Sequence, residues 1–439
     1  MNRLHASTGF PDQNRSSSTA RRRNALLWWS AAGTLTLLIG YVIALQLEHV
    51  GRVTPLFPRT VLWCFIPYAL VARWLYEGSH LPPLEHGSFV WVVTTVPFAL
   101  TPLGFALLQQ PYSRGAVLLA YGLSTAWFIA GHWLLSRRRV LRLTYLDASV
   151  PASLRQLLHP QPLDTRELQL TPWPQPRPND LLALTDGVVL DRQAHSDTHR
   201  NQLISELKLQ HVPLYSVEAA AELLSGRRMP TAPGQEDLWG LTGHPTYDLA
   251  KRAIDFALAL ATSPLWIPLC LAAGLAVKLD SPGPMLFSQI RIGRNGQSFR
   301  IWKIRSMRHA PSDHAARFAQ LQDARITKVG RFIRKTRLDE LPQLWNVLRG
   351  DMSLIGPRPE QAQFVQDFAL RMPAYPYRHL VRPGLTGWAQ VQQGYADSAE
   401  QTAIKLSYDL YYVAHYSMAL DLLIAYKTIC TVATGFGAR

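Results

Sequence analysis

The stretch that decides the fold runs from Ala25 to Leu47 and reads ALLWWSAAGTLTLLIGYVIALQL, without one charged residue. About 20 such residues are needed for a helix to cross ~30 Å of hydrocarbon. Three further apolar runs follow, and we interpret the four together as transmembrane helices, because tryptophan lies near their ends and such runs are uncommon in soluble folds. The other three runs are Thr60 to Tyr76, Ser88 to Leu108 and Gly115 to Leu135.

The composition agrees with a membrane protein that has basic aqueous parts. The chain has 439 residues, of which 48% are hydrophobic and only 17% are charged, against about 25% in average soluble domains. Its formal net charge is +15. The three cysteines Cys64, Cys270 and Cys430 lie far apart, which argues against a disulfide framework and a clustered zinc site. The abundant apolar and aromatic residues argue against intrinsic disorder.

Basic clusters beside the spans predict their orientation. Arg21, Arg22 and Arg23 precede the first span, and a second cluster from Arg137 to Arg142 follows the fourth. The positive-inside rule then places both ends of the four-helix bundle in the cytoplasm. We therefore predict a cytoplasmic tail over 1–24, four transmembrane helices over 25–136, a linker and soluble module over 137–244, and a further domain over 245–439.

The middle region is predicted to be a small α/β module behind a proline-rich linker. A β-α-β-α rhythm is indicated by a strand over 181–190, a helix over 201–210, a strand over 212–216 and a helix over 217–224. This rhythm is typical of a Rossmann-like module. Because no G-x-G-x-x-G is present, a structural or oligomerisation role is favoured over dinucleotide binding.

A fifth apolar run, Phe256 to Val277, is long enough to cross a membrane, but two features argue against crossing. Ser263 and Pro264 lie near its middle, where proline removes a backbone donor and kinks a helix. Crossing would also place the basic remainder of the chain outside the cell, against the charge rule. We predict a re-entrant helix over about 249–278 that is broken at Ser263 and Pro264, with an ordinary proline-kinked span as the alternative.

The last part of the chain combines many cations with one carboxylate pair. Lys251 to Arg439 holds 24 Lys and Arg against 13 Asp and Glu. Cations from Arg325 to Arg337 recur at i,i+3 spacing and run directly into the adjacent Asp339 and Glu340. Phe299 to Arg305 predicts a strand with a cationic face, and Arg358 lies in a rigid Gly-Pro-Arg-Pro turn.

Fixed cations around two carboxylates suit phosphoryl transfer, because charge on the non-bridging oxygens must be neutralised. One carboxylate can attack phosphorus, and its neighbour can hold a divalent metal together with substrate phosphates. A cationic helix face could also bind nucleic acid or anionic headgroups. The carboxylate pair at its end favours a phosphate-handling site over nucleic acid.

These motifs together resemble the bacterial sugar transferases, the monotopic polyprenol-phosphate phosphoglycosyl transferases. The resemblance covers Tyr247 to the C-terminus and is carried by the broken hydrophobic helix and several ordered motifs. These motifs are Lys251-Arg252, Lys303 to Met307, Thr327 to Arg331, Arg337 to Asn346, Gly356 to Pro359, and Arg382 to Gly387. With its four spans and middle module, the whole chain is similar to the large undecaprenyl-phosphate galactose or glucose phosphotransferases.

The resemblance implies a reaction and roles for single residues. Asp339 would attack the β-phosphate of a UDP-hexose and release UMP, and undecaprenyl phosphate would then accept the sugar phosphate. This transfer would start the repeat units of O-antigen, capsule or exopolysaccharide. Glu340 would ligate Mg²⁺. The basic residues that bind substrate phosphates would be Lys303, Arg305, Arg334, Arg337 and Arg358, and Asp409 would be an accessory carboxylate of the substrate site.

The expected fold is thus a membrane α+β protein: a four-helix transmembrane bundle, a Rossmann-like module and a mostly helical catalytic domain on a re-entrant helix. The expected location is the bacterial inner membrane, with the catalytic domain in the cytoplasm, membrane lipids as partners and a homodimer as a plausible assembly.

Two other functions stay open. One is a membrane glycosyltransferase that releases UDP, and the other is a non-enzymatic scaffold for polysaccharide assembly.

Overall fold

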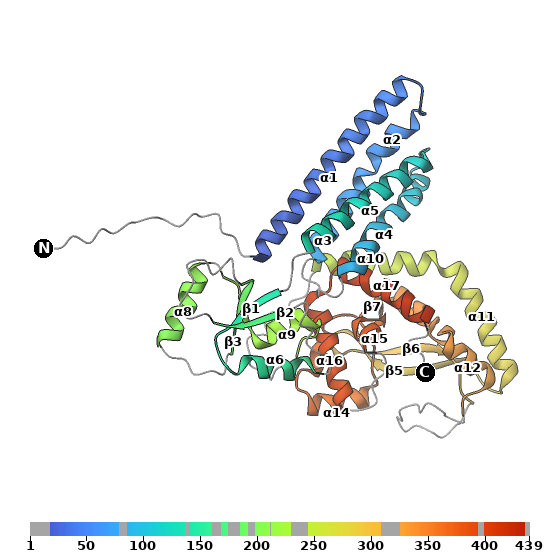
Figure 1. The fold of residues 1–439 in the computed structure, drawn as a ribbon. Helices are drawn as coiled ribbons and strands as arrows, with labels where there is room; N and C mark the ends of the chain where they lie inside the picture. The colour runs from blue at the N-terminus through green and yellow to red at the C-terminus, as the bar shows by residue number, and fades with distance from the viewer. Residues whose placement is uncertain are drawn as a thin grey trace. The chain divides into compact units, whose positions relative to one another are not determined.

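The computed structural model of the chain is mostly helical and divides into two compact units, 1–225 and 226–439 (Figure 1). It describes residues 18–78, 86–136, 141–159, 168–173, 185–191, 198–210, 212–229, 245–308, 325–393 and 399–434. The predicted tail overlaps the first helix, which begins at Ser18. Arg137, Arg138 and Arg139 of the second basic cluster lie outside the described residues.

The first unit begins with the apolar helices. They are α1 (Ser18–His49), α2 (Leu56–Trp63), α3 (Phe65–Glu77), α4 (His86–Leu107) and α5 (Arg114–Ser136). Trp29 of α1 and Trp127 of α5 stack with ring centroids 4.6 Å apart, and each indole Nε1 donates to the other's carbonyl oxygen at 3.1 Å. Many outward-facing residues of these helices are exposed and apolar.

The second predicted span is not one long helix, which corrects the expectation for Thr60 to Tyr76. It is divided at Cys64 into α2 and α3. The physical reason is Pro67, which has no N–H to donate to the carbonyl of Trp63 four residues earlier. Among the described residues, four helices are long and apolar enough to cross a membrane: Ala25–His49, Ser88–Leu107, Arg114–Leu134 and Ser263–Asp280.

The rest of the first unit is a four-stranded parallel sheet with helices between its strands. Its elements are β1 (Leu141–Tyr145), α6 (Val150–Leu158), β2 (Leu168–Pro172), β3 (Gly187–Leu190), α8 (Thr198–Leu209), β4 (Leu214–Ser216) and α9 (Val217–Ser225). The strand order is β2-β1-β3-β4. The predicted helices over 201–210 and 217–224 are present as α8 and α9. β1, α6 and β2 precede the predicted rhythm, and of these β2 lies within the proline-rich stretch.

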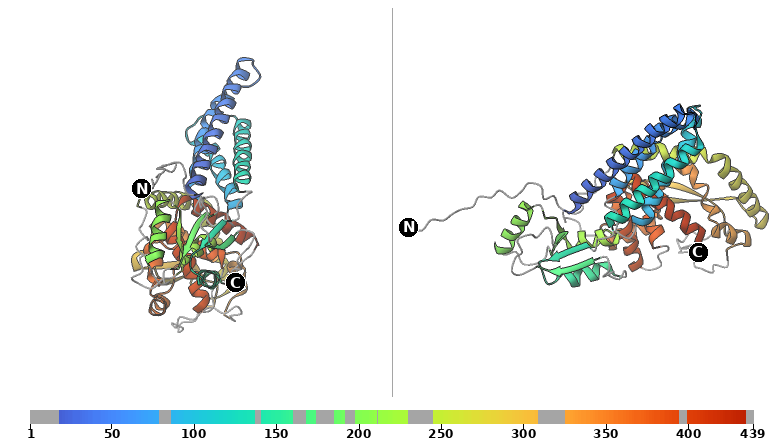
Figure 2. Two further views of the ribbon diagram at one scale, coloured as in Figure 1. Left: turned by 60° about the vertical axis from the view of Figure 1, so that its left-hand side comes forward. Right: turned by 45° about the horizontal axis from the view of Figure 1, so that its top comes forward.

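The second unit starts with α10 (Pro245–Ala261) and α11 (Ser263–Asp280), which meet at Thr262 with a bend visible in Figure 1 and Figure 2. Pro264 cannot donate to the carbonyl of Leu260, and Trp266 Nε1 donates to the carbonyl of Ala259 at 3.0 Å across the break. The predicted break at Ser263 and Pro264 is therefore present.

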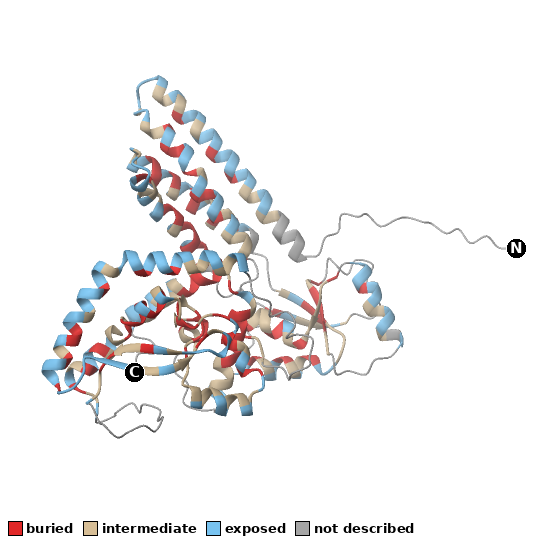
Figure 3. Cartoon of the chain, turned by 180° about the vertical axis from the view of Figure 1, so that it is seen from behind, coloured by how far each residue is buried: buried red, intermediate tan, exposed pale blue. Residues whose placement is uncertain are grey.

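Both helices cover the second unit with one face and expose the other. Ala259, Trp266, Ala273 and Val277 are buried against its core. The opposite side carries exposed apolar residues, seen as pale blue along these helices in Figure 3. They include Leu249, Phe256, Leu260, Leu265, Leu271 and Leu275.

The remaining elements of the second unit are short. They are β5 (Leu286–Ile292), η4 (Arg294–Gly296), β6 (Ser298–Ile304), α12 (Lys328–Lys335), η5 (Leu338–Glu340), α13 (Gln343–Arg349), β7 (Ser353–Ile355), α14 (Ala362–Arg371), η6 (Tyr375–Leu380), β8 (Gly384–Thr386), α15 (Trp388–Gln392), α16 (Ala399–His415) and α17 (Met418–Thr434). β5 and β6 form an antiparallel hairpin, and β7 pairs with β8 in parallel.

Candidate active site

The carboxylate pair lies on η5, a single 3₁₀ turn that follows helix α12. The cationic stripe is shorter than predicted, since α12 covers only Lys328–Lys335 and leaves Arg325 and Arg337 outside the helix. Arg337 has a φ of 56°, in the left-handed region that residues with a Cβ adopt rarely. This residue ends the α12 segment and turns the chain so that Asp339 and Glu340 follow at once.

Helix α12 is held against the end of β6 by a close backbone approach. Thr327 caps the helix, because its Oγ1 accepts a hydrogen bond from Gly330 N at 2.9 Å. A Cβ at Gly330 would lie 2.0 Å from the carbonyl oxygen of Ser306, so only glycine fits there. The contact brings the α12–η5 segment beside the strand that carries Lys303.

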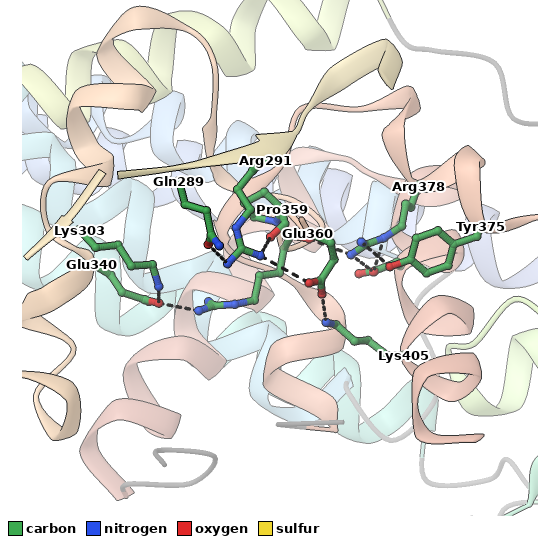
Figure 4. A network of polar contacts seen from close by, with 11 residues as sticks. Gln289, Arg291, Lys303, Glu340, Pro359, Glu360, Tyr375, Arg378 and Lys405 are labelled. Atoms are coloured by element: carbon green, nitrogen blue, oxygen red, sulfur yellow. Dashed lines mark hydrogen bonds and ion pairs between the residues drawn. The ribbon is translucent and has the colours of Figure 1, made fainter. Parts of the chain in front are cut away.

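Three basic side chains from different segments converge on Glu340, and Figure 4 labels one of them, Lys303. Its Oε1 accepts from Lys303 Nζ at 3.0 Å and from Arg358 Nη2 at 2.6 Å. Arg337 Nη1 lies 3.7 Å from Oε2. Burial alone would raise the pKa of Glu340, but Arg358 and Lys303 outweigh it and hold the pKa well below its usual range. Glu340 is therefore a fixed, ionised carboxylate.

Asp339 has a different electrostatic environment from its neighbour. Burial and the adjacent charge of Glu340 raise its pKa to about 6, although Lys303, Arg358 and Arg334 act in the opposite direction. Its side chain is only half-buried. A carboxylate of this kind is mostly ionised near neutral pH and is more basic than an ordinary aspartate, which suits a nucleophile.

Known proteins are similar to the second unit, and one of them is similar to most of the chain. A family model described as "Bacterial sugar transferase" covers residues 246–435. A protein of Aeromonas hydrophila, named UDP-N-acetylgalactosamine-undecaprenyl-phosphate N-acetylgalactosaminephosphotransferase, is 38% identical over 384 residues, which span 87% of this chain and 88% of that protein. The chain belongs to the bacterial sugar transferase family.

Two further sugar transferases match over a smaller part of the chain. Both are named UDP-glucose:undecaprenyl-phosphate glucose-1-phosphate transferase. The one from Escherichia coli (strain K12) is 40% identical over 204 residues, 44% of each chain. The one from Caulobacter vibrioides is 43% identical over 189 residues, 43% of this chain and 71% of that protein.

The structure of this sugar transferase brings five of the predicted site residues together around Glu340. Lys303, Arg337 and Arg358 pair with it directly, and Arg334 influences the neighbouring Asp339 electrostatically. The predicted strand over 299–305 is β6, but its basic residues do not share one face. Arg300 and Lys303 are three positions apart, and side chains alternate between the two faces of a strand.

Arg305 lies apart from this cluster. Its guanidinium is buried and donates to the carbonyl oxygens of Ser281, at 2.7 Å, and Pro282. The reason is that β6 ends at Ile304, so the next side chain turns toward the C-terminal end of α11. In this structure Arg305 holds the end of α11, and its predicted contact with substrate phosphate stays a prediction.

Asp409 is also separate from the carboxylate pair. It is 2% exposed on α16, and its Oδ2 accepts from Arg378 Nε at 3.1 Å and Nη2 at 2.7 Å. The sequence analysis missed Arg378. It also missed Glu360 and Lys405, which form an ion pair with each other at 2.6 Å (Figure 4). The signal that could have found them was Glu360 itself, which directly follows the Gly-Pro-Arg-Pro turn.

Proposed function

We propose that this protein transfers a sugar 1-phosphate from a UDP-sugar to undecaprenyl phosphate, releases UMP, and so starts a polysaccharide repeat unit. The observation that carries the proposal is the pair of adjacent carboxylates with unlike environments, Asp339 and Glu340, inside the part of the chain that matches the family. The printed names of the relatives support undecaprenyl phosphate as acceptor and a UDP-sugar as donor.

The first half-reaction forms a bond between Asp339 and the sugar-bearing phosphorus. A carboxylate oxygen of Asp339 attacks the β-phosphorus, and the bond from that phosphorus to the oxygen bridging the two phosphates breaks. UMP leaves with the electron pair, and the sugar phosphate stays on Asp339 as an acyl phosphate. Arg358, Lys303 and Arg334 supply positive charge where the phosphate oxygens gain negative charge.

The second half-reaction regenerates the carboxylate. An oxygen of undecaprenyl phosphate attacks the same phosphorus, and the bond to Asp339 breaks. The product is a sugar joined to the lipid through a diphosphate. Splitting the transfer into two displacements lets one site handle a water-soluble donor and a lipid acceptor in turn.

Glu340 is the proposed ligand of Mg²⁺. The described residues contain no group of three or more His, Cys, Asp or Glu that could form a protein-only metal site. Mg²⁺ commonly binds one or two carboxylates and completes its shell with substrate phosphates and water. The residues fit this mode, because the hydrogen bonds from Lys303 and Arg358 both go to Oε1 of Glu340, and Arg337 Nη1 lies 3.7 Å from Oε2. The ion would neutralise phosphate charge.

The acceptor's phosphate lies at the membrane surface, and we propose that α10 and α11 keep the site at that level. Their exposed apolar face would enter one leaflet and return to the cytoplasmic side, as a re-entrant helix broken at Ser263 and Pro264. The location would be the bacterial inner membrane. The homodimer considered from the sequence stays part of this proposal.

The sugar of the donor is proposed from how much of this chain each relative matches. The sequence predicts galactose or glucose. The relative that matches 87% of this chain is named for N-acetylgalactosamine, whereas the two glucose transferases match 44% and 43% of it. We therefore propose UDP-N-acetylgalactosamine as the donor to test first, with UDP-glucose and UDP-galactose beside it.

Product analysis tests the function. Purified full-length protein is incubated with each UDP-sugar, undecaprenyl phosphate and Mg²⁺, and the released nucleotides are separated. UMP that depends on both the donor and Mg²⁺ supports the proposal. Release of UDP would instead identify a glycosyltransferase, and the absence of turnover with every donor would favour a scaffold.

A further inference from the structure

The tripeptide Arg358-Pro359-Glu360 is held in place by basic side chains at every residue (Figure 4). Arg378 Nη2 donates to the carbonyl oxygen of Arg358 at 2.9 Å, and Arg291 Nη1 donates to that of Pro359 at 3.2 Å. The carboxylate of Glu360 accepts from Lys405 Nζ at 2.6 Å. These contacts fix the backbone from which the Arg358 guanidinium reaches Glu340.

Arg378 is the most deeply buried of these cations. Its side chain is 1% exposed and its partner Asp409 is 2% exposed. Besides its bonds to Asp409 and Arg358, it donates from Nη1 to the hydroxyl of Tyr375 at 3.1 Å. The planar fork of arginine can hold several acceptors at set angles, which lysine cannot do.

A buried ion pair of this kind is weak evidence for a role in stability. Removing two charges from water costs free energy that the pair recovers only in part, and apolar replacements of both partners are often neutral. The hydrogen bond from Arg378 to the carbonyl oxygen of Arg358 indicates a second role for the pair, which is to hold the backbone of Arg358 in place. Misplacing a catalytic group by about 1 Å can lower a rate on the order of 10²-fold.

We propose that Arg378 and Asp409 are positioning residues for the transfer reaction. They hold the backbone carbonyl of Arg358 so that its guanidinium stays on Glu340 and beside Asp339. Asp409 then acts through Arg378 and Arg358 and does not touch substrate phosphate. The inference rests on the proposed function where it predicts the rate of UMP release. Where it predicts hydrogen exchange of the backbone, it rests on the structure alone.

A paired substitution tests this inference without leaving a charge buried alone. Arg378→Met with Asp409→Leu removes the ion pair and the donor to Arg358, but keeps apolar bulk. We expect kcat for UMP release to fall about 10- to 100-fold, with KM changed by less than about 3-fold, as for residues that orient direct ligands. In an Arg358→Ala background the same pair should lower kcat by less than about 2-fold, since the guanidinium it positions is gone. If the paired substitution lowered kcat in the Arg358→Ala background by the same 10- to 100-fold as in the wild type, the proposal would be overturned.

Arg378→Lys provides a second variant should the paired protein not fold. Lysine keeps the positive charge beside Asp409 but lacks the planar fork that reaches the carbonyl of Arg358. We therefore expect kcat to lie between those of the wild type and the paired variant. In the Arg358→Ala background, Arg378→Lys should not lower kcat further. Equal loss in both backgrounds contradicts positioning. Arg371→Met, exposed on α14, is the matched control.

Hydrogen exchange separates this proposal from the proposed function because it needs no substrate. The peptide from Ser353 to Gln361 should exchange faster in the Arg378 variants than in the wild type, even if the enzyme released no UMP at all. Unchanged exchange of that peptide would show that Arg378 does not hold the segment. In that case the proposed transfer reaction could still stand.

Discussion

Lys303 Nζ lies 3.0 Å from Glu340 Oε1, although 37 positions separate the two residues in the sequence. Lys303 comes from a strand of the β5–β6 hairpin, and Glu340 from a 3₁₀ turn beyond helix α12. Arg358 reaches the same oxygen from a third segment. One carboxylate thus joins three segments of the second unit, and its neighbour Asp339 is half-buried beside them.

Replacing Asp339 with asparagine should abolish the reaction at its first step. The amide cannot attack phosphorus and form the acyl phosphate, so UMP release should fall on the order of 10³-fold or more. Wild-type protein incubated with a donor labelled in the sugar, without acceptor, should retain the label. Asp367→Asn, on the exposed side of α14, should behave as the wild type. Label retained by the Asp339→Asn protein would rule out this nucleophile.

The rate should fall in acid because Asp339 must be ionised to attack. With a pKa raised to about 6, kcat/KM should decline roughly tenfold per pH unit below that value. Arg334→Met removes a cation that lowers this pKa, so the acid limb should move to higher pH. Arg349→Met, whose side chain is 58% exposed in the wild type, should leave the limb in place. A pH–rate profile of the three proteins makes the comparison, and an unmoved limb in Arg334→Met would contradict it.

The raised pKa of Asp339 also predicts a cost to stability at neutral pH. Its folded-state pKa exceeds the unfolded value, so the unfolded chain releases the proton first, and stability falls as pH rises from about 4 to about 6. Asp339→Asn should therefore be more stable than the wild type at pH 7 but not at pH 4. A rise in pKa from 3.8 to about 6 corresponds to about 3 kcal/mol, which solvent screening of this half-buried group reduces to about 2 kcal/mol. Thermal melts at both pH values test this. An equal difference at the two pH values would contradict the assigned cause.

Gly330→Ala should displace helix α12 from the end of β6. The new Cβ would lie 2.0 Å from the carbonyl oxygen of Ser306, a backbone atom that cannot rotate away. We expect a loss of about 1–3 kcal/mol in stability and a lower kcat, because Arg334 and η5 move with the helix. Gly122→Ala in α5 is the matched control, since its Cβ would meet nothing within 4 Å. Melting curves and UMP release report both effects.

Labelling of single cysteines decides whether α10 and α11 cross the membrane. In a chain without Cys64, Cys270 and Cys430, we expect Thr246→Cys and Lys278→Cys to resist an impermeant reagent added outside sealed cells. Both positions should react after the cells are opened. Arg52→Cys, between α1 and α2, should react from outside and serve as the positive control. Outside labelling of Lys278→Cys alone would identify a crossing helix.

Local chemistry explains why much of the fold was predictable. Apolar runs of about 20 residues, Pro264 in the middle of one of them, and the adjacent carboxylates Asp339 and Glu340 are all visible without tertiary contacts. The division of the second predicted span at Cys64 was missed, although Pro67 is its cause. β1 and β2 were also missed, because each is only five residues long and pairs with strands far away in the sequence. β2 lies within the proline-rich stretch as well.

The sequence by itself determined that this is a membrane protein with apolar helices and a basic, carboxylate-bearing domain of the sugar transferase family. Those features depend on composition, spacing and short motifs. Only the tertiary structure decided which cations serve the carboxylates. Arg305 and Lys303 are two residues apart, yet one holds the end of α11 and the other holds Glu340. Asp409 meets Arg378 because helices and turns distant in the chain pack together, and long-range packing of this kind leaves no local pattern.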